Sequence, residues 1–290
     1  MDPLLQSSIH DAIEADDAVQ AQRLIDIEPQ CIAQLCQTAP LDFLKKLNPQ
    51  SIITYAILYE YEDYIKYIAE TCPTMLNMIT PYGIYPIHAF ASRITLKKIN
   101  ILRTCISAGI NINQQSVKFR HTLLSDIIYK VCGVTKPCHR EYILIMIKLL
   151  LESGANVNIA DHKSITPLFN IVNILIYATE QPEYKIILEL LIDYGADPYI
   201  KNNKHKNVFD YLDRWNAPTC MTLDEYNDRD IDGIKEIKQR NRDVANYLYQ
   251  CLNKRIGKEM LAAMTTGYFL IIPRDIRYYI ARFNYDYPKI

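Results

Sequence analysis

Residues 132–139, CGVTKPCH, bring two thiols and one imidazole close together, and these are ligands that Zn²⁺ prefers. Zinc-binding cysteines are usually two to four residues apart and are followed by a second ligand pair. Here five residues separate Cys132 from Cys138, and no second Cys/His pair follows His139 at such a distance. The sequence therefore predicts no metal site at this position. It favours a long connection between two helices over residues 129–142.

Residues 228–233, DRDIDG, match the first half of a calcium-binding loop, in which acidic side chains alternate before a glycine. The twelfth position of such a loop is a bidentate Glu, but here it is Gln239. Residues 216–227 also make a poor entering helix. A solvated loop is the better interpretation of this segment.

Motifs of the common enzyme classes are absent from the sequence. There is no phosphate-binding loop, nucleophile elbow, zinc-protease helix or dinucleotide-binding turn. The six histidines are scattered and give no positive reason to expect a nucleophile with a base beside it. We therefore expect no catalytic residues, no cofactor and no enzyme activity.

The overall composition is that of a folded chain, with 49% hydrophobic residues, 22% charged residues and a formal net charge of −1. This balance argues against general binding to nucleic acids or to membrane surfaces. No apolar run approaches the ~18 residues of a membrane-spanning helix, and the N-terminus has no secretory signal pattern. Eight scattered cysteines without a C-x-x-C pair indicate reduced thiols. We expect a cytoplasmic protein, with the nucleus as the alternative.

A start signal and a stop signal recur along the chain. The clearest starts are DHKSITPL at residues 161–168 and TPYGIYPIHAF at residues 80–90, and the copies begin near residues 7, 51, 85, 122, 166 and 207. Gly109, Gly154 and Gly195 each follow an apolar helical pattern. A glycine in that place favours the left-handed conformation that ends a helix. Recurrence in phase disfavours the alternative, an irregular helical bundle.

Each unit between these signals contains two short amphipathic patterns, for example near residues 167–177 and 184–194. Such a helix pair cannot bury its apolar face alone, whereas stacked copies form one continuous core. The sequence predicts an all-α solenoid of about six helix-turn-helix units over residues 1–215. An irregular insert and a helix ending at Gly257 follow over residues 216–257, and a C-terminal helical segment occupies residues 258–290.

The start signal resembles the ankyrin pattern D-x-x-G-x-T-P-L-H-x-A, most specifically over residues 80–200. Gly83 and His88 match the turn glycine and the histidine of that pattern, while Ser164 and Phe169 replace them in the copy at residue 166. The resemblance implies that Thr166 caps a helix, that Pro167 occupies its first turn and that His88 is a structural hydrogen-bonding group. Ankyrin repeats bind other proteins, so a partner on the repeat surface is expected.

The C-terminal segment contains a second resemblance. Pro273 suits the first turn of a helix whose apolar residues recur at helical spacing. This helix resembles the opening helix of an F-box, although Asp275 stands where Glu is usual. The residues that form or match the pattern are Ile272, Pro273, Asp275, Ile276, Tyr279, Ile280 and Phe283.

An ankyrin array that ends in such a helix is similar to the poxvirus host-range ankyrin proteins, whose terminal segment is called the PRANC domain. The resemblance implies that the tail docks on the adaptor subunit of an SCF-type ubiquitin ligase while the repeats capture a host protein. Alternatively, the helix only caps the last repeat, or it recruits as a SOCS-box-like helix does. If the helix only caps the array, the protein would sequester a host signalling factor, for instance of the NF-κB pathway. A third alternative is a catalytic function within residues 216–260.

Overall fold

The computed structural model describes residues 3–27, 35, 38–81, 83–131, 137–177, 181–213 and 231–266. All of the regular elements in these residues are helices. In chain order they are α1 (Pro3–Glu14), α2 (Ala18–Ile27), α4 (Leu41–Leu44), α5 (Pro49–Leu58), α6 (Glu62–Thr71), the 3₁₀ helices η1 (Pro73–Asn77) and η2 (Pro86–Ala91), α7 (Leu96–Ser107), α8 (Leu123–Val131), α9 (Pro137–Glu152), α10 (Pro167–Tyr177), α11 (Pro182–Asp193), α12 (Val208–Asp213) and α13 (Ile231–Thr266).

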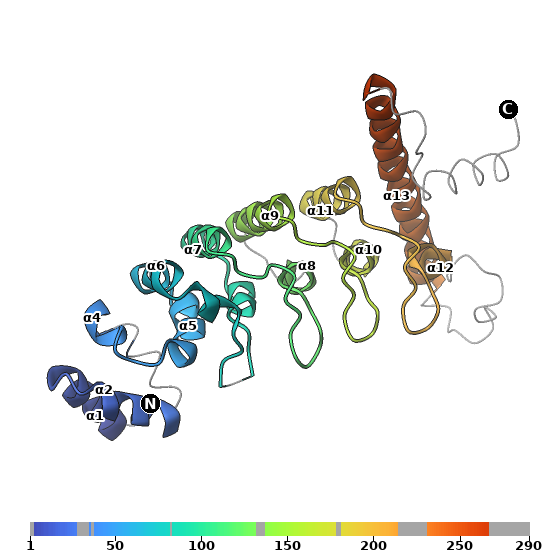
Figure 1. Ribbon diagram of the computed structural model, residues 1–290. Coiled ribbons are helices and arrows are strands. Elements are labelled where there is room, and N and C mark those ends of the chain that lie inside the picture. The colour runs from blue at the N-terminus through green and yellow to red at the C-terminus, as the bar shows by residue number, and fades with distance from the viewer. Residues whose placement is uncertain are drawn as a thin grey trace, which may run out of the picture.

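These helices form antiparallel pairs that stack in a row (Figure 1). The first helices α5, η2, α8, α10 and α12 contact one another in sequence. The second helices α6, α7, α9 and α11 form a layer along one side of them, and the long helix α13 crosses the end of the row. The pair α1 and α2 lies at the N-terminal end of the row. This architecture confirms the predicted all-α ankyrin-repeat solenoid.

A single apolar cluster runs through the row from Ile9 to Leu252. In α11, Ile187, Leu188 and Leu191 are fully buried between α9, α10 and α13. Because each repeat contacts only its neighbours, its apolar side chains become buried only when the next pair of helices is in place.

The second helices end in the same way in three successive repeats. Gly154 adopts φ 91°, its N–H donates to Leu151 O at 3.1 Å, and Ala155 N–H donates to Leu150 O at 2.9 Å. These two bonds form a Schellman motif, in which the left-handed residue satisfies carbonyls that the helix leaves free. Gly109 and Gly195, at φ 87° and 92°, make the corresponding pairs of bonds.

Asparagine side chains link successive repeats: Asn113 and Asn158 follow the turns at Gly109 and Gly154, and Asn77 ends η1. Asn158 Nδ2 donates to Gly195 O at 2.9 Å, and its Oδ1 accepts from Asp197 N–H at 2.8 Å. Asn113 makes the same two bonds to Gly154 O and Asn156 N–H, and Asn77 makes them to the following repeat. The side-chain amide thus satisfies one backbone acceptor and one backbone donor of the neighbouring repeat. We call Asn77, Asn113 and Asn158 the asparagine ladder.

The C-terminal helix differs from its prediction. It does not end at Gly257, as the sequence suggested, but continues to Thr266, so the expected boundary at 257/258 falls inside α13. One glycine in a helix costs only about 1 kcal/mol relative to alanine, and the residues that follow, KEMLAAM, are mostly strong helix formers. Helix α13 contacts α10, α11 and α12, so it serves as the second helix of the last pair.

The predicted long connection at residues 129–142 is also shorter than expected. Helix α8 continues to Val131 and α9 begins at Pro137. Proline is well suited to a first helical position because its missing N–H would have no partner there. Within the described part of the chain, no helix combines the length and the apolar character needed to cross a membrane.

Candidate protein-binding surface

The hairpin tips between successive repeats project from one side of the array (Figure 1). Each tip turns back through a residue in the left-handed region, two residues before the start signal of the next repeat. These residues are Gly83, Arg120, Ser164 and His205, at φ 74°, 55°, 58° and 57°. The repeated turn holds the tips of the last repeats at regular positions along one edge.

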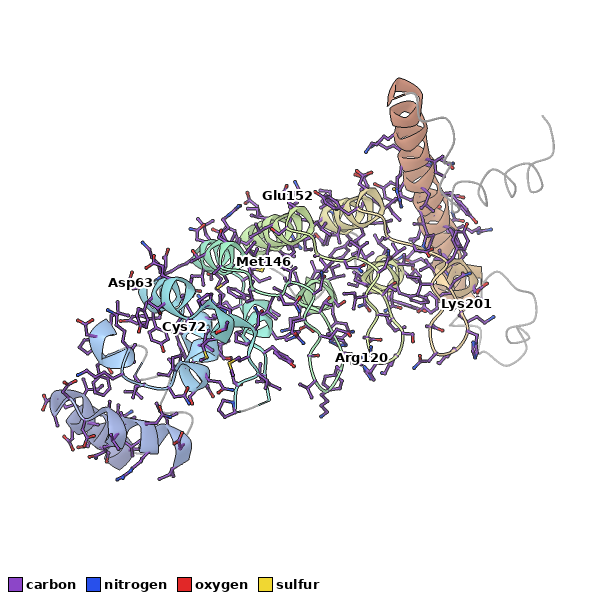
Figure 2. The ribbon with its side chains drawn as sticks, viewed as in Figure 1. Asp63, Cys72, Arg120, Met146, Glu152 and Lys201 are labelled. Atoms are coloured by element: carbon purple, nitrogen blue, oxygen red, sulfur yellow. The ribbon has the colours of Figure 1, made fainter. Side chains whose placement is uncertain are left out.

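The last three of these tips carry exposed positive charge. Figure 2 shows Arg120 and Lys201 on this edge, on the side opposite to Asp63 and Glu152. Residues 116–121, 162–164 and 200–207 contain no Asp or Glu. Their exposed cations, which we call the basic tip edge, are Lys118, Arg120, Lys163, Lys201, Lys204 and Lys206.

Apolar side chains lie beside this charge. Phe119 is 46% exposed at the tip between the third and fourth pairs, and Val117 is exposed next to it. Tyr129 on α8 and Tyr177 on α10 are exposed on the first helices of two adjacent repeats. Exposed aromatic groups are enriched in protein interfaces, where they act as anchors.

A network of histidines and carboxylates lies at the base of the same tips. Asp126 on α8 binds His88 Nδ1 at 3.1 Å through Oδ2 and His121 Nδ1 at 2.9 Å through Oδ1. Burial alone would raise the pKa of Asp126, but the hydrogen bonds and positive charge of His88 and His121 outweigh it and hold the pKa below its usual value. His121 Nε2 also lies 3.5 Å from Asp161 Oδ2.

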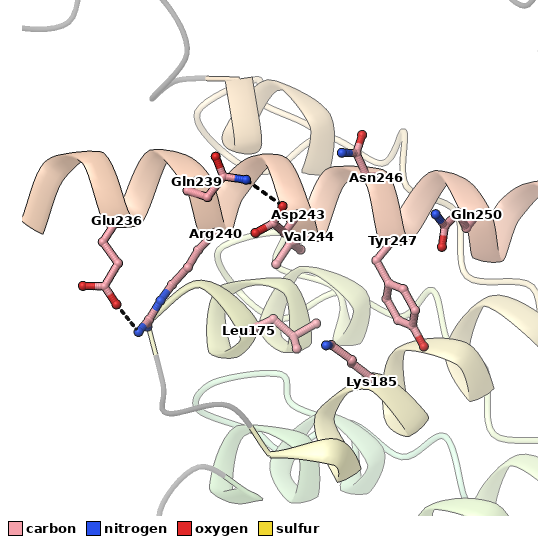
Figure 3. Close-up of a pocket in the computed structure, with 10 residues that line it drawn as sticks. All are labelled: Leu175, Lys185, Glu236, Gln239, Arg240, Asp243, Val244, Asn246, Tyr247 and Gln250. Atoms are coloured by element: carbon pink, nitrogen blue, oxygen red, sulfur yellow. Dashed lines mark hydrogen bonds and ion pairs between the residues drawn. The ribbon is translucent and has the colours of Figure 1, made fainter.

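A groove of about 640 Å³ lies where α13 crosses α10 and α11 (Figure 3). Several of its polar groups pair with one another or with a neighbour: Arg240 with Glu236 at 2.6 Å, and Tyr247 Oη with Glu189 Oε1 at 2.6 Å. Burial, reinforced by Glu189, raises the pKa of Tyr247 and keeps its phenol protonated. No His, Cys, Ser or Thr is among the described residues that line the groove. These side chains join α13 to the array.

Two of the described cysteines are buried and unreactive. Burial raises the pKa of the Cys105 thiol to about 12 and that of Cys251 to about 11. Only the thiolate is a good nucleophile or metal ligand, so both groups are inert at neutral pH. They act as small apolar residues of the core.

The sequence-predicted motif residues occupy structural positions in the repeats. Thr166 is buried, and its Oγ1 accepts from Phe169 N–H at 3.3 Å at the start of α10, where Pro167 is the first helical residue. His88 lies within η2 and binds Asp126 of the next repeat, and Gly83 lies at a tip. Gly109, Gly154 and Gly195 lie at the helix ends described above.

Three predicted segments lie partly or wholly outside the described residues. They are the F-box-like helix at residues 272–283, the side chains of Cys132, Cys138 and His139, and the calcium-loop-like residues 228–233. Of residues 228–233, only the backbone of the last three is described, at the start of α13. Sequence reasoning did not identify the basic tip edge, the asparagine ladder or the histidine network. The clustering of Lys and His around residues 118–121, 162–163 and 201–206 was the available signal for the first of these.

Comparison with known proteins supports the fold. No known protein family's sequence profile matches the chain. A protein of Acanthamoeba polyphaga mimivirus that is described as an ankyrin repeat protein is 33% identical to it over 90 residues. The similar segment makes up 31% of this chain and 20% of the length of the viral protein. Together with the stacked helix pairs, this similarity supports an ankyrin-repeat protein with a protein-binding role.

Proposed function

We propose that this chain is a non-enzymatic adaptor whose basic tip edge captures an acidic surface of a partner protein. The observation that carries the proposal is the row of six exposed cations on the tip segments 116–121, 162–164 and 200–207, next to exposed Phe119. A positive row attracts an acidic surface and accelerates association, while an aromatic anchor supplies buried apolar area. The stacked repeats hold both features in a constant geometry.

Charge reversal on the tips tests this proposal. In the variant Lys118→Glu, Lys163→Glu, Lys204→Glu, we expect the affinity for a protein captured from host-cell extract to fall by about 10-fold or more, because three exposed charge pairs of up to about 1 kcal/mol each become repulsive. The affinity of the wild-type chain should also weaken as the salt concentration rises. Binding is measured by calorimetry with the purified partner.

A matched control separates local from general charge effects. Lys66, Lys97 and Lys148 are exposed on the second helices α6, α7 and α9, away from the tips. Reversing these three lysines changes the net charge by the same amount and should leave the affinity unchanged. If the two triple variants lose affinity equally, the tip edge is not the binding surface.

We further propose that the tail recruits the adaptor subunit of an SCF-type ubiquitin ligase to the captured protein. Support for this step comes from the F-box-like spacing of Ile272, Pro273, Ile276, Ile280 and Phe283 in the sequence. The alternative is a sequestering protein that holds a host signalling factor of the NF-κB type, with the tail only capping the array.

Truncation distinguishes these two roles. A chain that stops after Gly267 keeps α13 whole, since that helix ends at Thr266. We expect only the full-length chain to recover ligase subunits from host extract, while both chains keep the same melting temperature by circular dichroism. Equal recovery by the two chains would contradict recruitment, and unfolding of the shorter chain would favour the capping role.

A further inference from the structure

We propose that His121, Asp161 and His162 form a binding site for a divalent transition-metal ion of the Zn²⁺ class that joins two neighbouring tips. One potential ligand atom from each of the three residues lies within 4.8 Å of the other two. Two imidazole nitrogens and one carboxylate oxygen form a donor set that suits Zn²⁺, with a fourth position left for solvent.

The hydrogen bond that His121 makes through Nδ1 leaves its Nε2 as the nitrogen that can bind a metal ion. Its Nδ1 lies 2.9 Å from Asp126 Oδ1, and a carboxylate can only accept, so Nδ1 carries the proton. When the ring is neutral, Nε2 is therefore the nitrogen with the lone pair, and it lies 3.5 Å from Asp161 Oδ2. Histidines that bind metals usually donate their second N–H to a carboxylate or a carbonyl in this way.

The histidine His162 has the same arrangement with a carbonyl in place of the carboxylate. Its Nδ1 lies 3.0 Å from Phe119 O, so Nδ1 again carries the proton and Nε2 is free to bind a metal ion. The side chain is exposed, which gives an ion access from solvent. The Phe119 ring packs against both imidazoles, at centroid distances of 5.8 Å and 5.5 Å, and restricts their rotation.

The carboxylate of Asp161 is fixed by its own turn. Its Oδ1 accepts from Lys163 N–H at 2.7 Å and from Ile165 N–H at 2.8 Å, while Oδ2 faces His121. The side chain is only 10% exposed. Two partly buried carboxylates, Asp126 and Asp161, thus lie beside imidazoles, an arrangement that attracts a cation.

The three donors come from two tips that are about one repeat apart in the sequence. His121 belongs to the tip before α8, and the other two residues belong to the tip before α10. Spacing along the chain therefore does not reveal the site. A bound ion would fix the distance between two tips of the basic tip edge, although the site does not depend on the proposed partner.

Zinc affinity of paired tip variants tests the inference. The reduced full-length chain is titrated with Zn²⁺ in competition with a chromophoric chelator. We expect His162→Asn to weaken Zn²⁺ binding by more than about 100-fold, which exceeds the roughly 10- to 100-fold effect of losing an outer hydrogen-bond partner. Asp161→Asn should also weaken binding strongly, while its amide oxygen can still accept the bonds of the turn.

The control is His205→Asn, the same substitution on the next tip. His205 is exposed and adopts φ 57°, which asparagine tolerates, so zinc affinity and melting temperature should both stay unchanged. Co²⁺ should give a spectrum without a thiolate-to-cobalt band. Equal zinc affinity in His162→Asn and the wild type, no saturable binding, or a thiolate band that places the ion on cysteines would each overturn the inference.

Discussion

Replacement of Ile187 by alanine is expected to lower the free energy of unfolding by about 2–5 kcal/mol, the range for removing a large aliphatic side chain from a packed core. The Ile187 side chain is 0% exposed in α11, and this helix packs against α9, α10 and α13. The lost methyl and methylene groups leave a cavity at the junction of two repeats. Urea unfolding followed by circular dichroism measures the change.

The preceding residue is a natural control. Ile186 is the same residue type on the same helix but is 38% exposed. Ile186→Ala changes the helix propensity by the same amount as Ile187→Ala. It should alter the free energy of unfolding by less than about 0.5 kcal/mol, as exposed substitutions usually do. If the two variants lose similar stability, α11 does not pack through the face described here.

A loss of about 1–3 kcal/mol is expected when Asn158 in the asparagine ladder is replaced by alanine. The substitution removes two hydrogen bonds, at 2.9 Å to Gly195 O and at 2.8 Å from Asp197 N–H. It leaves a backbone acceptor and a backbone donor of the next repeat without their partners. Because repeats are coupled only to their neighbours, unfolding should also become less cooperative at this junction.

Asn100→Ala provides the comparison for this variant. Asn100 is exposed on α7, so its replacement by a better helix former should be neutral or slightly stabilising. Stability is compared from urea unfolding curves, and cooperativity from the slope of each curve. If Asn158→Ala behaves like Asn100→Ala, the ladder does not contribute to coupling between repeats.

The tyrosines of the second repeat show that spacing along the chain does not by itself separate buried from exposed residues. Tyr59, Tyr61, Tyr64 and Tyr67 recur at spacings that place some of them in the core and some on the surface, but the spacing does not assign them. In the structure, Tyr64 is fully buried and Tyr59 is exposed. Tyr64 lies on α6, which packs against α5 and α7, whereas Tyr59 directly follows the last residue of α5.

Local chemistry was sufficient to predict the repeated fold from the sequence. The left-handed glycines, the helix-start residues and the apolar periods each depend on residues within a turn or two of a helix, and their recurrence in phase indicates the repeat. The same reasoning was wrong at Gly257 and at the connection after Tyr129, where α13 and the α8–α9 pair continue further than expected. A helix end depends on what packs beside it as well as on its own residues.

The sequence by itself therefore determined the kind of unit, its approximate number and the fact that its copies stack, because each helix pair leaves an apolar face that only another copy can cover. Tertiary structure alone decided which side chains from different repeats meet. The asparagine ladder, the basic tip edge and the group of His121, Asp161 and His162 each combine residues about one repeat apart. Stacking of the repeats brings these residues together, and no local sequence pattern indicates that they meet.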